Sequence, residues 1–191
     1  LDETKWSIEP VTSLPVAISS AGYATFNAPV ALTIPSGLRA YTGTDNGETL
    51  HLDEVSGTLP KNTPVILKTD SETSGNFDLD LTDDVDAITG NALTGTIEAE
   101  PVPVEKIYTL QKKNGEVGFY RYSGGEVKGF KAYLSSSAGI IGFTFEFSGI
   151  TGINKAETDL QGKEIYDMQG RRVTQPQRHG IYVKDGKKVV F

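Results

Sequence analysis

The sequence contains no cysteine, which excludes disulfides, thiolate nucleophiles and cysteine metal ligands. It has two histidines, His51 and His179, far apart along the chain, so a histidine-based metal or catalytic site is not expected. No apolar run approaches the ~18 residues that a membrane-spanning helix needs, so we expect no transmembrane segment. Acidic residues outnumber basic ones by 25 to 18, and the net charge of −7 argues against nucleic acid as a partner.

What is present indicates many short strands. The chain has 191 residues, with 21 glycines and 9 prolines spread evenly between apolar runs that alternate with polar residues. Turn signals recur at the spacing typical of a sandwich or barrel. We therefore predict an all-β fold, an antiparallel β-sandwich or partly open barrel with a small C-terminal β-hairpin tail.

Five stretches carry the clearest strand patterns. "PVALTIP", "ETLHLDEV", "NFDLDL" and "FTFEF" alternate, and the last sets Phe143, Phe145 and Phe147 on one face, which we expect to be core. "PVILK" (64–68) is apolar on both faces, so it predicts a central, covered strand. No helix of three turns is expected. "LTDDVDAITG" (81–90) could form one short helical turn.

The stretch "KKNGEV" predicts a hairpin, because Asn-Gly suits a two-residue type I′ turn. Its register would pair Lys113 with Glu116 and place Tyr120 and Tyr122 on the face opposite the apolar one. A second hairpin is predicted in "VKDGKKVV", with Lys184 opposite Lys187.

Charge divides the chain into two parts. Residues 149–191 carry 8 basic and 5 acidic residues, whereas residues 1–148 carry 10 basic and 20 acidic ones. The change of sign predicts an antiparallel β domain over 1–148 and a three-strand β tail over 149–191. The chain opens with "LDETKWSIEPV" and has no initial Met, so we expect that a targeting segment was removed or that a longer protein precedes it.

The tail has a family resemblance. "IYDMQGRRV" followed by "GIYVKDGKKVVF" resembles the last part of the C-terminal sorting domain of the Bacteroidetes Por (type IX) secretion pathway. The residues that carry the resemblance are Tyr166, Asp167, Gly170, Arg171, Arg172, Gly180 and Tyr182. The full sorting domain is longer and begins with Pro-Asn-Pro, where this chain has "GINKAETDLQGKE", so the tail resembles a shortened relative. The resemblance implies export, hence an extracellular or cell-surface location.

The rest of the chain resembles a β module that recurs in secreted and surface proteins of gut Bacteroidetes. The stretches concerned are "ISSAGYATFNAPVALTIPSGLRAYTG", "LPKNTPVILK" and "GFYRYSGGEVKGFKAYLSSS". That resemblance implies no enzymatic activity and a position C-terminal to another domain. A plainer interpretation of the tail is also open, namely a β structure whose lysines protect an exposed strand edge.

Three kinds of chemistry remain to be weighed. Asp83, Asp84 and Asp86 are weak calcium candidates, because they lack the Asp-x-Asp-x-Asp-Gly spacing of a calcium loop. "SSSAG" is not a nucleophile elbow, although a pair of carboxylates for a glycosidase is always available by chance. Tyr120 and Tyr122 could form an aromatic platform for sugar, or could simply pack in a sandwich.

We therefore expect a non-catalytic accessory module of an exported surface or secreted protein, with a role in architecture, display or adhesion. Its partner would be a surface glycan or a protein, and no cofactor is expected. A carbohydrate-binding module that uses its tyrosines is the alternative, and a glycoside-active enzyme fragment is the third possibility.

Overall fold

The computed structural model describes residues 10–103 and 106–148 and, beyond them, the backbone of four short strands. All regular elements in these residues are strands, which confirms the all-β class. The chain divides into two compact units, Leu1–Ser148 and Gly149–Phe191. Within the described residues, no helix has the length and apolar character that crossing a membrane would require.

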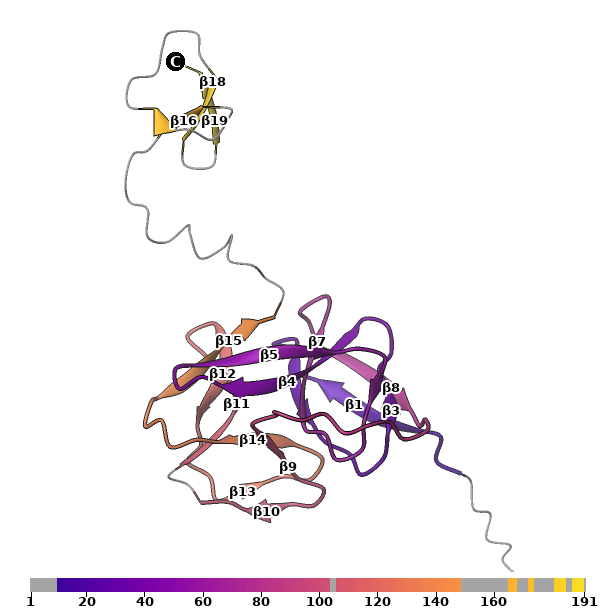
Figure 1. Ribbon diagram of the computed structural model, residues 1–191. Coiled ribbons are helices and arrows are strands. Elements are labelled where there is room, and N and C mark those ends of the chain that lie inside the picture. The colour runs from indigo at the N-terminus through magenta and orange to yellow at the C-terminus, as the bar shows by residue number, and fades with distance from the viewer. Residues whose placement is uncertain are drawn as a thin grey trace, which may run out of the picture. The chain divides into compact units, whose positions relative to one another are not determined.

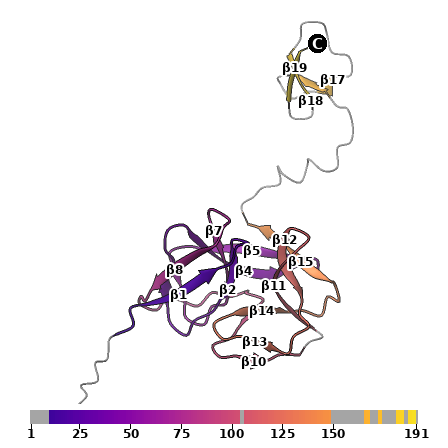
Figure 2. The same ribbon diagram turned by 180° about the vertical axis from the view of Figure 1, so that it is seen from behind.

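The first unit is built on one nine-stranded sheet that curls into a partly open barrel (Figures 1 and 2). The strand order is β2-β7-β4-β5-β15-β12-β11-β14-β9. Their bounds, in that order, are Tyr23–Phe26, Val65–Thr69, Leu38–Asp45, Thr49–Val55, Gly142–Phe147, Glu116–Arg121, Ile107–Lys113, Ala132–Ser135 and Leu93–Gly95.

One pair in this sheet departs from the expected antiparallel arrangement. β15 runs parallel to β5, with Glu146 opposite His51 and Phe147 opposite Leu52. The alternation of apolar and polar residues sets which face of a strand is buried, but it is the same for either strand direction. The long connection between the two strands permits this direction, because only a tight hairpin obliges neighbours to run antiparallel.

Three two-stranded sheets complete the first unit. They are β1 (Ser13–Ile18) with β8 (Gly75–Asp80), β3 (Leu32–Thr33) with β6 (Thr58–Leu59), and β10 (Glu100–Pro101) with β13 (Glu126–Val127). The expected strand "PVALTIP" is therefore shorter than predicted, although Leu32 is fully buried and Val30 and Ile34 pack against the same cluster.

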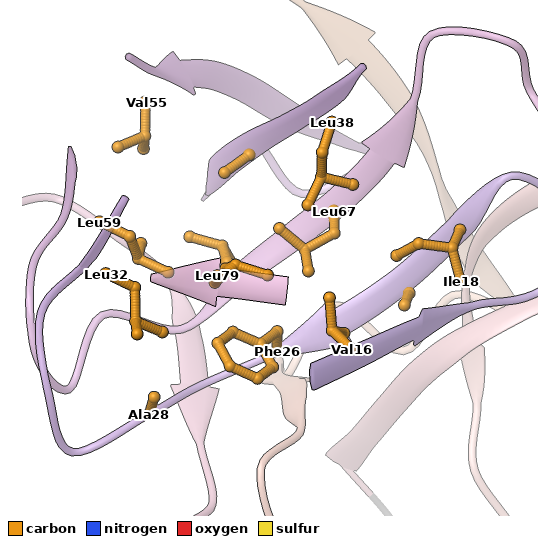
Figure 3. Packing of buried hydrophobic residues seen from close by; sticks show 13 residues of the cluster. Val16, Ile18, Phe26, Ala28, Leu32, Leu38, Val55, Leu59, Leu67 and Leu79 are labelled. Atoms are coloured by element: carbon orange, nitrogen blue, oxygen red, sulfur yellow. The ribbon is translucent and has the colours of Figure 1, made fainter. Parts of the chain in front are cut away.

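The strands β2, β7 and β4 are covered on both faces. In β7, Val65 and Leu67 belong to one apolar cluster, shared with β1 and β8, while Ile66 belongs to a second cluster inside the curled sheet. Figure 3 shows Leu67, Leu79 and Phe26 converging in the first cluster. This arrangement confirms "PVILK" as a central strand, and the burial of each of its three side chains contributes about 1.5–3 kcal/mol.

The second cluster is largely aromatic. Tyr108 and Phe143 meet edge to face with ring centroids 4.9 Å apart, and both are fully buried. Phe145 and Phe147 also pack against this cluster but are only partly buried. The expected core face of "FTFEF" is thus confirmed, and it becomes more exposed towards the end of β15.

The Asn-Gly hairpin forms as predicted. Asn114 and Gly115 have φ values of 53° and 88°, as a type I′ turn requires. Lys113 pairs with Glu116. The reverse face of this hairpin contributes Ile107 to a small third cluster, completed by Val102 and Val127.

The prediction of a helical turn within 81–90 was wrong. The segment after β8 has no helical residue, and Leu81, expected on the core face of its strand, is 40% exposed. The backbone N–H of Thr82 donates instead to the carbonyl of Ala31, which anchors the segment to a neighbouring loop rather than capping a turn.

In the described residues of the second unit, the backbone forms four strands, where three were predicted. Their order is β17-β16-β18-β19, with bounds Arg172–Val173, Ile165–Asp167, Ile181–Lys184 and Lys187–Val190. The predicted pairing of Lys184 with Lys187 is confirmed.

The turn before β2 offers a test of this fold. Gly22 has a φ of 78°, and a Cβ placed on it would lie 2.7 Å from the backbone of Glu72. Gly47 has a similar φ of 89° but open space around it. We expect Gly22→Ala to lower the free energy of unfolding by about 3 kcal/mol and Gly47→Ala by about 1 kcal/mol, measured by chemical denaturation. Equal losses from the two variants would mean that the close approach of Gly22 to the backbone of Glu72 contributes nothing to stability.

Candidate functional site

The first unit has a cavity of about 830 Å³ where the curled sheet fails to close. We call it the seam cavity. One wall is the segment from Ala17 to Thr25, which includes β2. The opposite wall is the second half of β11, from Thr109 to Lys112, and the segment 125–132 forms a third side. A cavity of this size can accommodate a small ligand or a short piece of chain.

The cavity exists because two strands each lack a neighbour. β2 pairs with β7 along one edge and has no strand partner on the other. β11 pairs with β12 over most of its length, but its pairing with β14 stops at Tyr108. At the far end of β2 the gap is bridged, because the Asn27 side-chain N–H₂ group donates to the carbonyl of Thr96 at 3.4 Å.

Lysines dominate the charge around the seam cavity. Lys112, Lys128 and Lys131 line it, against a single carboxylate from Glu126. Burial, and then the positive charge of Lys128, lower the pKa of Lys131 below its ordinary value. The cavity is therefore a cationic site on a strongly acidic part of the chain, and it favours an anionic ligand.

The two tyrosines singled out from the sequence have different surroundings. Tyr122 lines the seam cavity, and its hydroxyl donates to the carbonyl of Glu126 at 2.7 Å. Tyr120 lies across Gly142 and Gly118, whose missing side chains leave room for its ring. The Nζ of Lys113 lies 5.0 Å from the centre of that ring. Burial, and then Glu116, raise the pKa of Tyr120.

A second hollow of about 310 Å³ shares Tyr23 and Lys112 with the seam cavity. Phe145 and Phe147 line it, and the Nζ of Lys68 lies 5.3 Å from the ring centre of Phe147. Lys68 also pairs with Glu72 at 2.8 Å. Phe145 and Phe147 thus extend the lining of the seam cavity towards the end of β15. Because the two hollows share lining residues, we treat them as one groove.

A serine, a histidine and an aspartate meet at the exposed face of β5. The Oγ of Ser148 lies 2.9 Å from the Nε2 of His51 and donates a hydrogen bond to Asp53. In a catalytic triad the carboxylate orients the histidine, which in turn takes the serine proton. Here the serine proton points at the carboxylate, so the arrangement is an exposed polar network and not a triad.

The calcium candidates lie along an exposed segment. Asp84 forms an ion pair with Lys61, whose hydrogen bond lowers the pKa of Asp84. Asp83 and Asp86 are exposed on either side of it. Within residues 10–103 and 106–148, no group of three or more acidic or histidine side chains is placed to hold a metal ion.

The backbone of the second unit brings part of the tail motif together. Tyr166 in β16 lies opposite Arg172 in β17, and Asp167 lies opposite Tyr182 in β18. Gly170, Arg171 and Gly180 lie outside the described residues, as does His179.

Sequence reasoning missed the lysines of the seam cavity. Lys112 comes from β11, while Lys128 and Lys131 come from a loop after β13, and the three share no motif. Of the cavity residues, only Tyr122 was singled out from the sequence, as an aromatic residue that follows the Asn-Gly hairpin. The unpaired strand edges could not be seen in the sequence, because they depend on where distant strands end.

The effect of the Lys128 charge on the cavity can be measured through the pKa of Lys131. Changing Lys128 to Gln removes one cause of the lowered pKa of Lys131, so that pKa should rise, although burial keeps it below the ordinary lysine value. Between the folded and unfolded pKa values of Lys131 the unfolded chain binds more protons, so its contribution to stability increases with pH in that window. NMR titration of the lysine Cε signals measures the shift. Lys61→Gln is the control and should leave Lys131 unchanged.

Comparison of the chain with protein-family models, curated proteins and solved structures finds no significant match.

Proposed function

We propose that this chain is a non-catalytic accessory module of an exported bacterial surface or secreted protein, acting in architecture, display or adhesion. The seam cavity is its contact site for a partner. The observation that carries the proposal is a contrast between two sets of side chains: lysines line the cavity, whereas the acidic and histidine side chains lie on the surface. Within residues 10–103 and 106–148, every aspartate, glutamate and histidine is exposed or partly exposed.

This contrast supports binding over catalysis. General acids and bases are tuned by burial or by close charged neighbours, which move their pKa values towards neutrality. The described carboxylates with shifted pKa values, Glu72 and Asp84, are shifted downwards by lysine partners, which keeps them ionised. The seam cavity instead offers the ammonium groups of its lysines, which recognise an anionic ligand without transforming it.

Export is supported by the tail. Four of the positions that resemble a sorting domain, Tyr166, Asp167, Arg172 and Tyr182, fall within a paired β structure, in which β16 lies between β17 and β18. A receptor that reads such a motif would meet it as a compact unit and not as an extended chain.

Deleting residues 165–191 tests this part of the proposal. In the native host we expect the shortened chain to lose export and surface attachment, measured by cell fractionation and surface labelling. The matched control replaces Lys187 and Lys188 with Ala, which keeps the residues that carry the sorting resemblance. If the deleted chain reaches the surface as efficiently as the full chain, the tail has no sorting role.

Carbohydrate binding is the second candidate, favoured by the place of Tyr122 in the cavity wall. Under the proposal preferred here, a glycan array probed with the purified chain should show no saturable binding. Saturable binding that is lost in Tyr122→Ala or Tyr120→Ala, but kept in Tyr120→Phe, would replace it, because phenylalanine retains the ring on which a sugar stacks.

A further inference from the structure

We propose that the seam cavity binds an extended, acidic peptide segment, which adds a strand to the free edge of β11. The inference rests on the proposal that this unit is a binding module, and it names the class of partner. Three independent features of the cavity point to such a segment: the direction of its backbone groups, its charge and its apolar floor.

The backbone of β11 supplies the first feature. The N–H of Tyr122 donates to the carbonyl of Ile107, which fixes the residues of β11 that bond to β12. Hydrogen-bonding direction alternates along a strand, so the N–H and C=O groups of Leu110 and Lys112 point away from β12. Pairing with β14 has already ended at Tyr108, which leaves these groups directed into the seam cavity.

The opposite wall repeats this arrangement. The N–H of Thr69 donates to the carbonyl of Gly22, so by the same alternation the backbone groups of Tyr23 and Thr25 point away from β7. The Tyr23 carbonyl is satisfied locally by the hydroxyl of Ser19 at 2.8 Å. Thr25 lines the cavity with no strand beyond it. An extended peptide is the ligand whose own backbone matches such edges.

Charge selects the kind of peptide. The seam cavity is lined by Lys112, Lys128 and Lys131 and by one carboxylate, Glu126, while the adjoining hollow adds Glu116 and Glu72, the latter paired with Lys68. Lys131 is partly buried, and no salt-bridge partner is found for it within the described residues. A peptide with carboxylates on one side would neutralise this cluster, whereas a basic peptide would be repelled by it.

The floor of the groove selects the other side of the peptide. Leu110 packs against the aromatic cluster, and Val117, Phe145 and Phe147 continue the floor in the adjoining hollow. Side chains of an added strand alternate between two faces. Leu110 and Lys112 share one face of β11, so a segment that alternates acidic and apolar residues places its apolar side chains beside Leu110 and along the aliphatic stem of Lys112, and its carboxylates on the other side, for Lys128 and Lys131.

The test uses the full 191-residue chain and a fluorescein-labelled decapeptide of alternating glutamate and valine, with fluorescence anisotropy as the readout. We expect saturable binding. A matched decapeptide of alternating lysine and valine should not bind. A third peptide, N-methylated on the glutamate amides, keeps its charge but loses alternate backbone donors, and it should bind at least about tenfold more weakly.

Two substitutions of Lys112 distinguish the contribution of backbone pairing to peptide binding from the contribution of charge. Lys112→Ala removes the ammonium group but keeps the backbone N–H, whereas Lys112→Pro removes both, at a position whose N–H is not needed for pairing with β12. We expect Lys112→Pro to weaken binding by at least about tenfold more than Lys112→Ala does. Lys113→Ala, on the residue whose backbone pairs with β12, is the control and should bind as the parent chain does. Thermal melting establishes that each variant is folded.

Three results would overturn the inference. Failure of the glutamate–valine peptide to bind would exclude an acidic strand as the ligand. If the N-methylated peptide binds as tightly as the glutamate–valine peptide, the cavity recognises charge alone. Complete displacement of the glutamate–valine peptide by a sulfated oligosaccharide would mean the same. If Lys112→Pro does not fold, the N-methylated peptide still decides between these readings. None of these outcomes depends on export. The deletion of residues 165–191 tests the accessory-module proposal separately.

Discussion

The burial of β7 on both faces is the constraint on which the first unit depends. Val65 and Leu67 face one apolar cluster and Ile66 the other, so a single strand forms the boundary between two cores. The neighbouring strands repeat this: Ala40 of β4 faces the first cluster and Tyr41 the second. Because both cores share this wall, a cavity or an unpaired polar group within it would weaken both at once.

The seam cavity follows from the same arrangement. On one face of β2, Ala24 and Phe26 pack in the first cluster with residues of β1 and β8, and the outer edge of β2 has no strand partner. Exposed strand edges invite unwanted pairing, and proteins commonly protect them with lysines or with local hydrogen bonds. Both devices occur here, since Lys112 stands on one edge and Ser19 satisfies a carbonyl on the other. The edges are protected against general aggregation yet still open to a segment of complementary charge.

Local features of the fold could be predicted from the sequence. The Asn114–Gly115 turn fixed its hairpin register, because few residue pairs adopt two successive positive φ values. The burial of Leu50 and Leu52 followed from simple alternation. Local patterns do not encode which distant strands pair, so the parallel contact between β5 and β15 was missed, as were the unpaired edges of β2 and β11 that form the seam. The lysines that define the candidate site come from separate segments, and only the folded arrangement brings them together.

The position of β15 has a consequence for how the protein folds. It is the last strand of the first unit along the chain, yet it lies in the middle of the nine-stranded sheet, between β5 and β12. Until it is in place, the strands on either side of it do not form one continuous sheet, although isolated hydrogen bonds, such as that from the Ala92 N–H to the Gly43 carbonyl, also link the two halves. Joining them requires contacts between residues far apart in sequence, which makes closure entropically costly and slow. The unit therefore cannot complete its core while it is still being synthesised, and it acquires its native structure only after the residues of β15 are available.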